Sequence, residues 1–503
     1  MIENYIVVSK NIFSEGNFFD GYFIVKDGLI QKVYKKSYKK SDDSYKVFDF
    51  GENIIIPCMI DCHSFFTGYY VRKFGEDISS CNSTEDLIKK IKGKEIDGVI
   101  IAKGLQKNLK LDENIFSKDF PDDMSILLFN WDEEFAFVNK KAKEKFLFDG
   151  KDFSSEGMWK ILKFVLEQKN ICKEIFIDYQ KLLLSKGVSF CKDMVFDDSY
   201  GLIEILKEIE ENNELILKIH FMSQPVGYNF SIENAKKIES ILFNSKKLKF
   251  DGYNQMVDGS VSVKEADVVD GYEDGDFCKM EIDYEKLEND AILADSNGYR
   301  FSLHGQGDGA VSKIIDIFNK CKKKEDGKLV NRHAITDLEF ANPNSYKKMA
   351  DLGIFTEIYP QILSIYDDSN EKINLTYERI GDRYKNYWNR RKMIDEGVIV
   401  SNATDLPLVI DDLGESIYSG CYHKFNDGNS FVSENAISLE EMLTCWTING
   451  AKNLGIDKKY GKIEDKYFAD FLVLNMNPIS INENTAKDLK VDKTFISGKL
   501  IKW

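Results

Sequence analysis

The sequence predicts an α/β protein: a (β/α)₈ barrel of the TIM type with an inserted α/β segment, plus a small β-sandwich domain formed by both chain termini. Two observations predict this fold class. In the middle of the chain, short β-branched runs alternate with amphipathic helical stretches, which is typical of a parallel sheet. Strand-like segments gather at both ends. A chain of 503 residues is also long enough for more than one domain.

The strand-like ends predict the sandwich domain. Residues 5–8, 22–25 and 29–34 are rich in β-forming side chains, and Asp27-Gly28 between the last two is a two-residue hairpin signal. Residues 471–474 and 491–496 are apolar, and a Ser497-Gly498-Lys499 turn leads into 500–503. Chain termini often lie close together. We therefore expect segments 1–56 and 452–503 to form one domain.

Eight further runs predict the strands of a barrel domain over 57–451. They are residues 54–61, 187–191, 216–221, 252–257, 299–303, 333–336, 353–358 and 398–401, with helices expected between them, for example at 202–210 and 310–323. The long gap after the first run contains strand-like segments at 98–102 and 125–129 and predicts an insertion at about 68–180. An open doubly wound sheet is the alternative, but its usual Gly-rich loop after the first strand is missing.

Composition excludes several classes of partner. The net charge is −16 and the lysines are spread along the chain, which disfavours binding to a phosphate backbone, so no nucleic acid is expected. No apolar run approaches the ~18 residues that a membrane helix needs, and no signal peptide is recognisable. Nine cysteines, an odd number without CxxC pairs, favour free thiols and a cytoplasmic location.

Barrel chemistry occurs at the C-terminal ends of the strands. Three of the five histidines are expected there together with carboxylates, and the candidates are Asp61, His63, Asn254, Asp258, His304, His333, Asp337 and Asp405. Imidazole and carboxylate bind zinc, iron or manganese, and a metal-bound water becomes a nucleophile near neutral pH.

Three neighbouring features have simpler interpretations. His220 has no ligand partner nearby in sequence and is expected in the core or in support of the site. His423 is expected in a solvated loop. Cys62 adjoins His63 but should point to the opposite face of its strand, which favours a buried thiol over a nucleophile.

Six segments, in order, resemble those of one enzyme family. They are IIIPCMIDCHSFF, GYNQMVDGS, SLHGQGDGAV, NRHAITDLEF, NATDLPL, and ISLEEMLTCWTINGAKNLGI with the following GKIEDKYFADFLVLNMNPI. Together they resemble the amidohydrolase superfamily, in particular its formamide-deformylase-like branch. The resemblance implies the same barrel and sandwich, and hydrolysis of a non-peptide C–N bond.

The resemblance also implies a metal site that is only partly kept. In the family, two first-strand histidines, a carboxylated lysine, two further histidines and an aspartate typically hold two metals. His63, His304 and Asp405 match three of those six positions. The other three carry Phe65, Asn254 and Asp337. Because asparagine cannot form the bridging carbamate, two metals are not expected.

The segment NWDEEFAFVN in the insertion also resembles a segment of the family, and Glu134 stands where the family has a histidine. From the resemblance we therefore expect Asp405 and His304 to be the catalytic residues. One divalent metal (zinc, manganese or iron) would be held by His63, His304, Asp337 and Asp405, or no metal would be bound. Substrate-binding residues would be Glu134, Asn254, Asp258 and His333.

Three functions stay open. The first is a hydrolase that acts on an amide, formamide or cyclic amide of a small molecule. The second is a catalytically degenerate scaffold that binds a small molecule or a partner. The third is metal-free chemistry by clustered carboxylates, which would raise one another's pKa. A homodimer is expected from the resemblance alone.

Overall fold

The computed structural model describes residues 4–39, 45–106, 109, 111, 113–130, 136–148, 155–196, 201–225, 229–366, 368–408 and 412–502. The chain forms two compact units. The first contains residues 1–65, 179–197 and 210–503, and the second contains the remaining segments.

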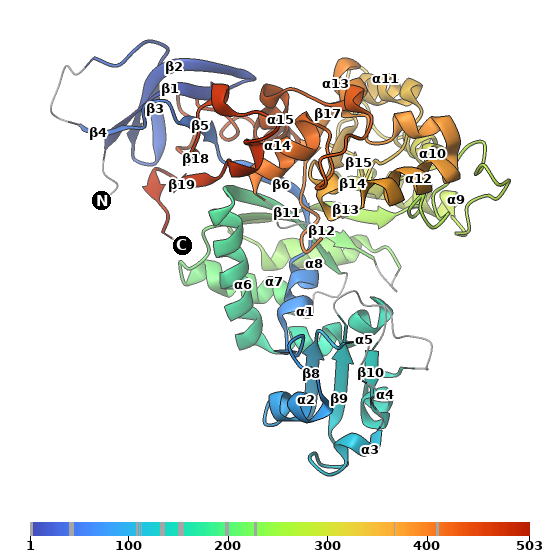
Figure 1. Ribbon diagram of the computed structural model, residues 1–503. Helices are drawn as coiled ribbons and strands as arrows, with labels where there is room; N and C mark the ends of the chain where they lie inside the picture. The colour runs from blue at the N-terminus through green and yellow to red at the C-terminus, as the bar shows by residue number, and fades with distance from the viewer. Residues whose placement is uncertain are drawn as a thin grey trace. The chain divides into compact units, whose positions relative to one another are not determined.

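Eight parallel strands form the barrel of the first unit (Figure 1). In order around the sheet they are β6 (Met59–Ser64), β11 (Val188–Phe196), β12 (Lys218–Gln224), β13 (Leu248–Met256), β14 (Arg300–His304), β15 (Ala334–Thr336), β16 (Phe355–Ile358) and β17 (Ile399–Asn402). The segment after β17 returns to β6, where the Asp405 amide donates to the His63 carbonyl at 2.9 Å and the Phe65 amide donates to Leu406 at 2.7 Å. The predicted barrel is confirmed.

The first predicted strand, 54–61, was wrong as a single element. The structure divides it into β5 (Ile54–Pro57), which belongs to the sandwich, and β6, which belongs to the barrel. The Cys58 amide between them donates to Asp470. An uninterrupted apolar run does not reveal such a change of sheet, because both strands are buried.

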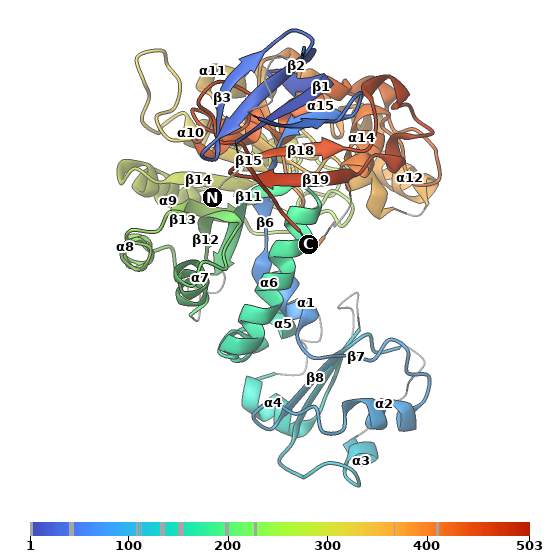
Figure 2. The ribbon, with the colours of Figure 1, turned by 90° about the vertical axis from the view of Figure 1, so that its left-hand side faces the viewer.

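Strands from both ends of the chain share the sandwich sheet, as predicted (Figure 2). Its order is β20 (Lys499–Leu500), β19 (Val491–Ile496), β18 (Phe471–Leu474), β5, β1 (Tyr5–Ser14), β2 (Asn17–Lys26) and β3 (Leu29–Tyr34), and β4 (Lys46–Asp49) pairs with β1. Asp27 and Gly28 both have positive φ, as a type I′ hairpin turn requires. Phe471 and Phe495 stack with their centroids 4.4 Å apart in the core between the two ends.

The sandwich meets the barrel at the N-terminal ends of its strands. Lys218, the first residue of β12, forms an ion pair with Asp470 at 2.8 Å. The Thr494 hydroxyl donates to the Leu184 carbonyl, just before β11. The opposite, C-terminal rim therefore stays available for the site.

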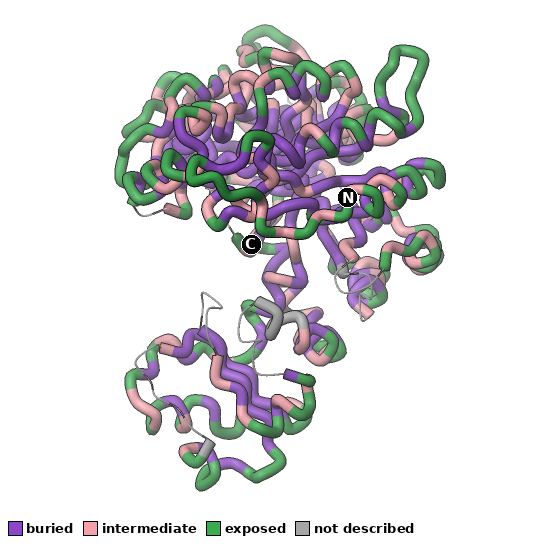
Figure 3. Tube along the Cα trace, turned by 90° about the vertical axis from the view of Figure 1, so that its right-hand side faces the viewer, coloured by how far each residue is buried: buried purple, intermediate pink, exposed green. Residues whose placement is uncertain are grey.

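Helices cover the outside of the barrel, and its strands are buried (Figure 3). α8 (Ile232–Ile241) packs on β13, α9 (Tyr284–Ser296) on β14, and α16 (Ile448–Leu454) on β6 and β17. The other helices of this part are α10 (Asp308–Phe318), α11 (Pro343–Leu352), α12 (Ser369–Ile380), α13 (Arg390–Asp395), α14 (Leu413–Cys421), α15 (Leu439–Trp446) and the C-terminal end of α6 (Lys169–Ser185), from Tyr179 onward. The helix predicted at 310–323 ends at Phe318, where the apolar positions give way to a lysine-rich turn.

The second unit has its own four-stranded sheet and core. Its strands are β7 (Glu76–Asp77), β8 (Val99–Lys103), β9 (Ser125–Phe129) and β10 (Ala136–Val138), and the runs predicted at 98–102 and 125–129 correspond to β8 and β9. Its helices are α1 (Phe66–Lys73), α2 (Thr84–Ile91), α3 (Glu113–Phe116), α4 (Lys140–Phe146), α5 (Ser155–Leu166) and most of α7 (Leu202–Glu211). Ile100, Ile126 and Leu128 form its buried centre.

Among the described residues, no helix combines the length and the apolar character needed to cross a membrane.

Candidate active site

Four predicted residues lie at the C-terminal rim of the barrel. His63 belongs to β6, His304 is the last residue of β14, Asp337 follows β15 and Asp405 follows β17. The side chains of His304 and Asp405 are 20% and 21% exposed, so solvent reaches them, whereas His63 is 3% exposed. The rim thus presents an imidazole and a carboxylate to a small molecule.

The four side chains form two pairs. His63 Nε2 lies 3.6 Å from Asp405 Oδ1, and His304 Nδ1 lies 2.5 Å from Asp337 Oδ2. Burial alone would lower the pKa of His304, but Asp337 outweighs this effect and raises the pKa to about 9. Burial would likewise raise the pKa of Asp337, and the His304 charge holds it below its usual value. His304 is therefore an imidazolium at neutral pH, and its buried Nε2 has no acceptor among the described residues.

A buried ion cluster supports this rim, and the sequence analysis missed it. Glu357 of β16 is fully buried and accepts hydrogen bonds from Lys192 of β11, from Arg300 and from Asn453. Its second oxygen, Oε2, lies 3.8 Å from His63 Nδ1. Burial would raise the pKa of Glu357, but Lys192, His63 and Arg300 together outweigh this effect and lower the pKa to about 2. Burial lowers the pKa of Lys192 to about 8. Lys192 and Glu357 are charged residues within otherwise apolar strand segments, and this pattern could have indicated from the sequence that they form buried ion pairs.

An aromatic wall flanks His63. The Phe65 ring meets the imidazole edge-on at 5.2 Å, and the Tyr359 ring lies 6.0 Å away. Phe65 stands where the family would place a second first-strand histidine. The rim consequently has one polar side and one apolar side.

Asn254 and Asp258 occupy neighbouring positions with different environments. The Asn254 amide donates to Gln224 at 3.1 Å, and its buried Oδ1 has no described partner. The Asp258 carboxylate accepts from three backbone amides, those of Asp267, Gln306 and Gly307, and so joins two rim loops. Burial raises the pKa of Asp258 to about 6. Glu134 lies outside the described residues.

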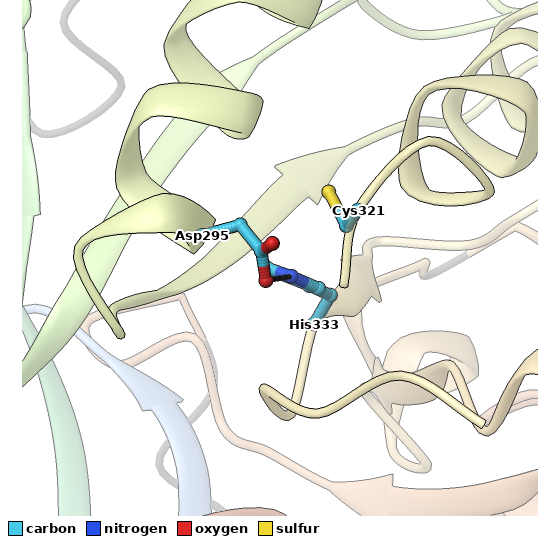
Figure 4. A group of neighbouring side chains, drawn as sticks. All are labelled: Asp295, Cys321 and His333. Atoms are coloured by element: carbon cyan, nitrogen blue, oxygen red, sulfur yellow. Dashed lines mark hydrogen bonds and ion pairs between the residues drawn. The ribbon is translucent and has the colours of Figure 1, made fainter. Parts of the chain in front are cut away.

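The expected rim position of His333 was wrong. His333 precedes β15, at the N-terminal end of the barrel, and is fully buried. Its Nε2 lies 3.0 Å from Asp295 (Figure 4). Its Nδ1 accepts a hydrogen bond from the Phe301 amide at 2.9 Å. The predicted run 333–336 agrees with β15 to within one residue, but His333 is at the beginning of that run, so its side chain belongs to the N-terminal end and not to the rim, where Asp337 lies.

Among the described residues, the three that bring metal-binding atoms within 4.8 Å of one another are Asp295, Cys321 and His333 (Figure 4). Hydrogen bonds already explain this cluster. Nδ1 of His333 accepts a hydrogen bond from the Phe301 amide, so the hydrogen of the neutral ring is on Nε2. Nε2 therefore has no lone pair with which to bind a metal. Burial raises the pKa of Cys321 to about 12, which disfavours a thiolate.

Asp61, His220 and His423, which the sequence also singled out, are all buried. Asp61 accepts from the Thr404 hydroxyl at 2.5 Å and from the Thr404 amide, so it fastens β6 to the segment after β17. Burial of the Asp61 carboxyl, and not repulsion from neighbouring carboxylates, raises the pKa of Asp61 to about 6. His220 lies in the core beside Asp251, at 3.7 Å. His423 was expected in solvent, but it is buried and contacts the Phe431 carbonyl.

No three of the described rim residues bring metal-binding atoms within 4.8 Å of one another, so these side chains, as they lie, do not form a metal site. The 3.6 Å between His63 Nε2 and Asp405 Oδ1 is close to the ~3.4 Å that separates two ligands of a tetrahedral zinc ion. His304 Nε2 is a third buried donor atom, although it must lose its proton to bind a metal. Phe65 and Asn254 offer no replacement for the second imidazole and the carbamate.

Comparisons with known proteins identify the family of the chain. Residues 175–501 match the amidohydrolase family. The N-substituted formamide deformylase of Arthrobacter pascens is 26% identical over 289 residues, 56% of this chain and 50% of that protein. The putative amidohydrolase YtcJ of Bacillus subtilis (strain 168) is 21% identical over 309 residues, 60% of this chain and 56% of that protein. The chain thus spans about half the length of these curated relatives.

Solved structures show the same fold. An uncharacterized metal-dependent hydrolase from Pyrococcus furiosus superposes with a TM-score of 0.75 at 17% identity, over 95% of this chain and 100% of that one. A second, from Pyrococcus horikoshii OT3, has a TM-score of 0.74 over 96% of this chain and 99% of that one, again at 17% identity. Because the family match covers well over half of the sequence, the chain belongs to the amidohydrolase family.

Proposed function

We propose that the protein hydrolyses a non-peptide C–N bond of a small molecule, an amide, formamide or cyclic amide, with at most one divalent metal. The observation that carries this proposal is the pairing of Asp405 with His63 on the solvent-reached rim, beside the His304 imidazolium. The formamide deformylase relative supports the same bond type.

The chain's own residues can perform the proton transfers. The Asp405 carboxylate accepts a proton from water while the water oxygen attacks the carbonyl carbon. The His304 Nε2–H donates to the carbonyl oxygen as negative charge develops there. Asp405 then returns the proton to the leaving nitrogen, and the C–N bond breaks. Glu357 and Asp405 flank His63, so the imidazole is oriented from both sides.

To hold a metal at the rim, His63, His304 and Asp405, with Asp337 beside them, would have to come closer together than they lie in the structure. When bound, it would polarise the carbonyl and lower the pKa of the attacking water. His304 Nε2 would then be a ligand and could not donate a proton. Elemental analysis of protein purified without chelator therefore separates the two forms of the mechanism.

Asp405→Asn is the direct test. Asparagine keeps the shape but cannot accept the proton of water, so we expect a loss of kcat of at least about 100-fold. Hydrolysis of a panel of formamides, amides and cyclic amides measures it. Asp395→Asn, an exposed carboxylate that pairs with Arg391, is the matched control and should keep full activity. Unchanged turnover by Asp405→Asn would exclude this mechanism.

A second candidate function is a binding scaffold without catalysis. It is favoured by the His304–Asp337 ion pair, which occupies two expected ligands, together with the Phe65 ring against His63. A metal-free protein that binds but never cleaves members of the panel would support it. The homodimer expected from the family stays a prediction, which light scattering in solution can test.

A further inference from the structure

A cavity of about 320 Å³ lies at the N-terminal end of the barrel, opposite the proposed active site. Its wall comes from α8, from the beginning of β13, from the turn before β14 and from the segment before β15. A Cβ at Gly298, in this wall, would meet nothing within 4 Å. The volume is within the range of small-molecule pockets, ~300–1,000 Å³. The cavity therefore has room for a ligand, and the proposed hydrolysis does not use it.

Two cations in the wall share one carboxylate. The Lys249 ammonium lies 2.8 Å from Asp251 Oδ1, and Arg332 Nη2 lies 3.5 Å from the same oxygen. Within the described chain, neither cation forms a second ion pair. Arg300 approaches the other oxygen, Oδ2, at 3.4 Å, but its charge is also shared with Glu357. One carboxylate thus serves Lys249 and Arg332 together, and each is only partly neutralised.

Both cations can be reached from the cavity, whereas their carboxylate cannot. The side chains of Lys249 and Arg332 are 53% and 34% exposed, and that of Asp251 is 2% exposed. Arg332 Nε donates to the Asn453 carbonyl, and Nη1 donates to no described acceptor. The Lys249 ammonium has three hydrogens and one described acceptor. An anion can therefore contact both cations without displacing Asp251.

Other charges near these cations do not take the place of such an anion. His220 lies 3.7 Å from Asp251, and burial lowers its pKa, so it adds no charge at neutral pH. Asp457 acts on Arg332 through its charge but forms no ion pair with it in the described structure. Lys218 and Asp470, also at this end of the barrel, form a pair of one cation with one carboxylate. Ion pairing at this end does not by itself require two cations at one oxygen.

The rest of the wall is mostly polar and offers hydrogen-bond acceptors. Asn297 and Asn331 donate to protein oxygens through their side-chain nitrogens, and their Oδ1 atoms accept no described hydrogen bond. Glu239 accepts from the Tyr299 hydroxyl at 3.0 Å and has further acceptor capacity. Hydroxyl groups of a ligand can donate to these oxygens in place of water, which an apolar ligand cannot do.

We propose that this cavity binds a phosphorylated polyol such as a sugar phosphate, with the phosphate between Lys249 and Arg332 and the hydroxyl groups along the acceptor-rich wall. A phosphate monoester carries about −1.5 to −2 charges at pH 7 and has three acceptor oxygens, so it can contact an ammonium and a guanidinium together. Because the cavity and Asp405 lie at opposite ends of the barrel, this ligand is not the substrate. The proposal is independent of the proposed function.

Calorimetric titration of the full-length protein at low ionic strength tests the ligand class. The probes are ribose 5-phosphate, ribose and inorganic phosphate. We expect ribose 5-phosphate to bind at least about 10-fold more tightly than inorganic phosphate, because its hydroxyl groups add hydrogen bonds to the acceptors. Ribose should bind at least about 10-fold more weakly than ribose 5-phosphate, because it lacks the charge-assisted contacts.

Variants of the two cations test the location of the site. Lys249→Met and Arg332→Met should each weaken the binding of ribose 5-phosphate by at least about 10-fold. Lys236→Met is the matched control: Lys236 is an exposed lysine of α8 that pairs with Glu233, outside the cavity wall, and this variant should keep the wild-type affinity. Thermal denaturation verifies that each variant is folded, and Lys249→Met, at a half-exposed side chain, is decisive if Arg332→Met does not fold.

Three results would overturn the proposal. The first is a wild type that does not bind ribose 5-phosphate. The second is a folded Lys249→Met variant that binds it as tightly as the wild type and Lys236→Met. The third is ribose or inorganic phosphate bound as tightly as ribose 5-phosphate, because the cavity would then recognise only one half of the proposed ligand.

Discussion

At the scale of single residues, buried charge in the barrel is placed by partners from distant strands. Glu357 forms ion pairs with Lys192 and Arg300 in the water-excluded interior of the barrel, and its other carboxylate oxygen faces His63. Such a cluster need not add stability relative to an apolar core, but removing one partner leaves the others uncompensated. Glu357 is therefore a positioning residue with a large structural penalty for its loss.

Glu357→Gln should lower the free energy of unfolding by about 3–5 kcal/mol, because Lys192 and Arg300 lose their shared counter-charge. Urea denaturation followed by intrinsic fluorescence measures the change. In the double variant Lys192→Met with Glu357→Gln, one unpaired cation is also removed, so the combined loss should be smaller than the sum of the two single losses. Additive losses would contradict the pairing.

His333 should make stability depend on pH. Burial lowers its pKa below the usual value of about 6.5, and its Nδ1 must stay unprotonated to accept from Phe301. Between the unfolded and the folded pKa the unfolded chain binds more protons, so stability is present above about pH 6.5 and is lost as the pH falls toward the lowered folded value.

His333→Gln should thus reduce the loss of unfolding free energy between pH 7 and pH 5, compared with wild type. His220 and His423 also have lowered pKa values and keep contributing, so the difference between the two proteins is the measured quantity. Asp295, whose pKa is lowered by His333 against the effect of burial, acts only at lower pH. Identical slopes would show that His333 is not the sensor.

At the scale of elements, β13 depends on a glycine at a register shift. The pairing of β12 with β13 changes register between Phe221 and Met222, opposite Gly252. A Cβ at Gly252 would overlap the carbonyl oxygen of Arg300 in β14. Because backbone of a central strand cannot move aside cheaply, this position requires glycine.

Gly252→Ala should lower the free energy of unfolding by about 3 kcal/mol or more. Gly298→Ala is the comparison, since Gly298 also has positive φ but meets nothing within 4 Å, and it should cost only about 1–2 kcal/mol. Thermal and urea denaturation measure both. A similar small loss for the two variants would mean that the contact with Arg300 does not matter.

At the scale of the whole molecule, the two ends of the chain hold the sandwich together. Phe495 near the C-terminus stacks on Phe471 and lies in one buried cluster with Tyr5, Val7 and Phe23 from the N-terminus. The same domain carries Asp470, which binds the barrel residue Lys218. Loss of packing in the sandwich is therefore expected to weaken the barrel as well.

Phe495→Ala should lower the free energy of unfolding by about 3–5 kcal/mol through the cavity it leaves. Circular dichroism and tryptophan fluorescence should follow the same shifted transition if sandwich and barrel unfold together. Ile479→Ala, at a side chain that is 96% exposed, is the control and should change little. Two separated transitions would show that the sandwich unfolds independently.

The sequence by itself determined the barrel, its strand order and the rim positions of His63, His304, Asp337 and Asp405. Local patterns suffice for these features, because parallel strands all end at one rim and polar residues just after them must lie there. It also indicated the sandwich of both termini, since each end carries strands that need partners.

Only the tertiary structure decided how the charges pair. Lys192 and Glu357 are 165 residues apart, and no local pattern specifies that they meet. The same holds for His304 with Asp337, for His333 at the opposite end of the barrel, and for Lys249 and Arg332, which meet at Asp251. Charge pairing depends on distances across the fold, so the barrel can be inferred from the sequence while the electrostatics of its site require coordinates.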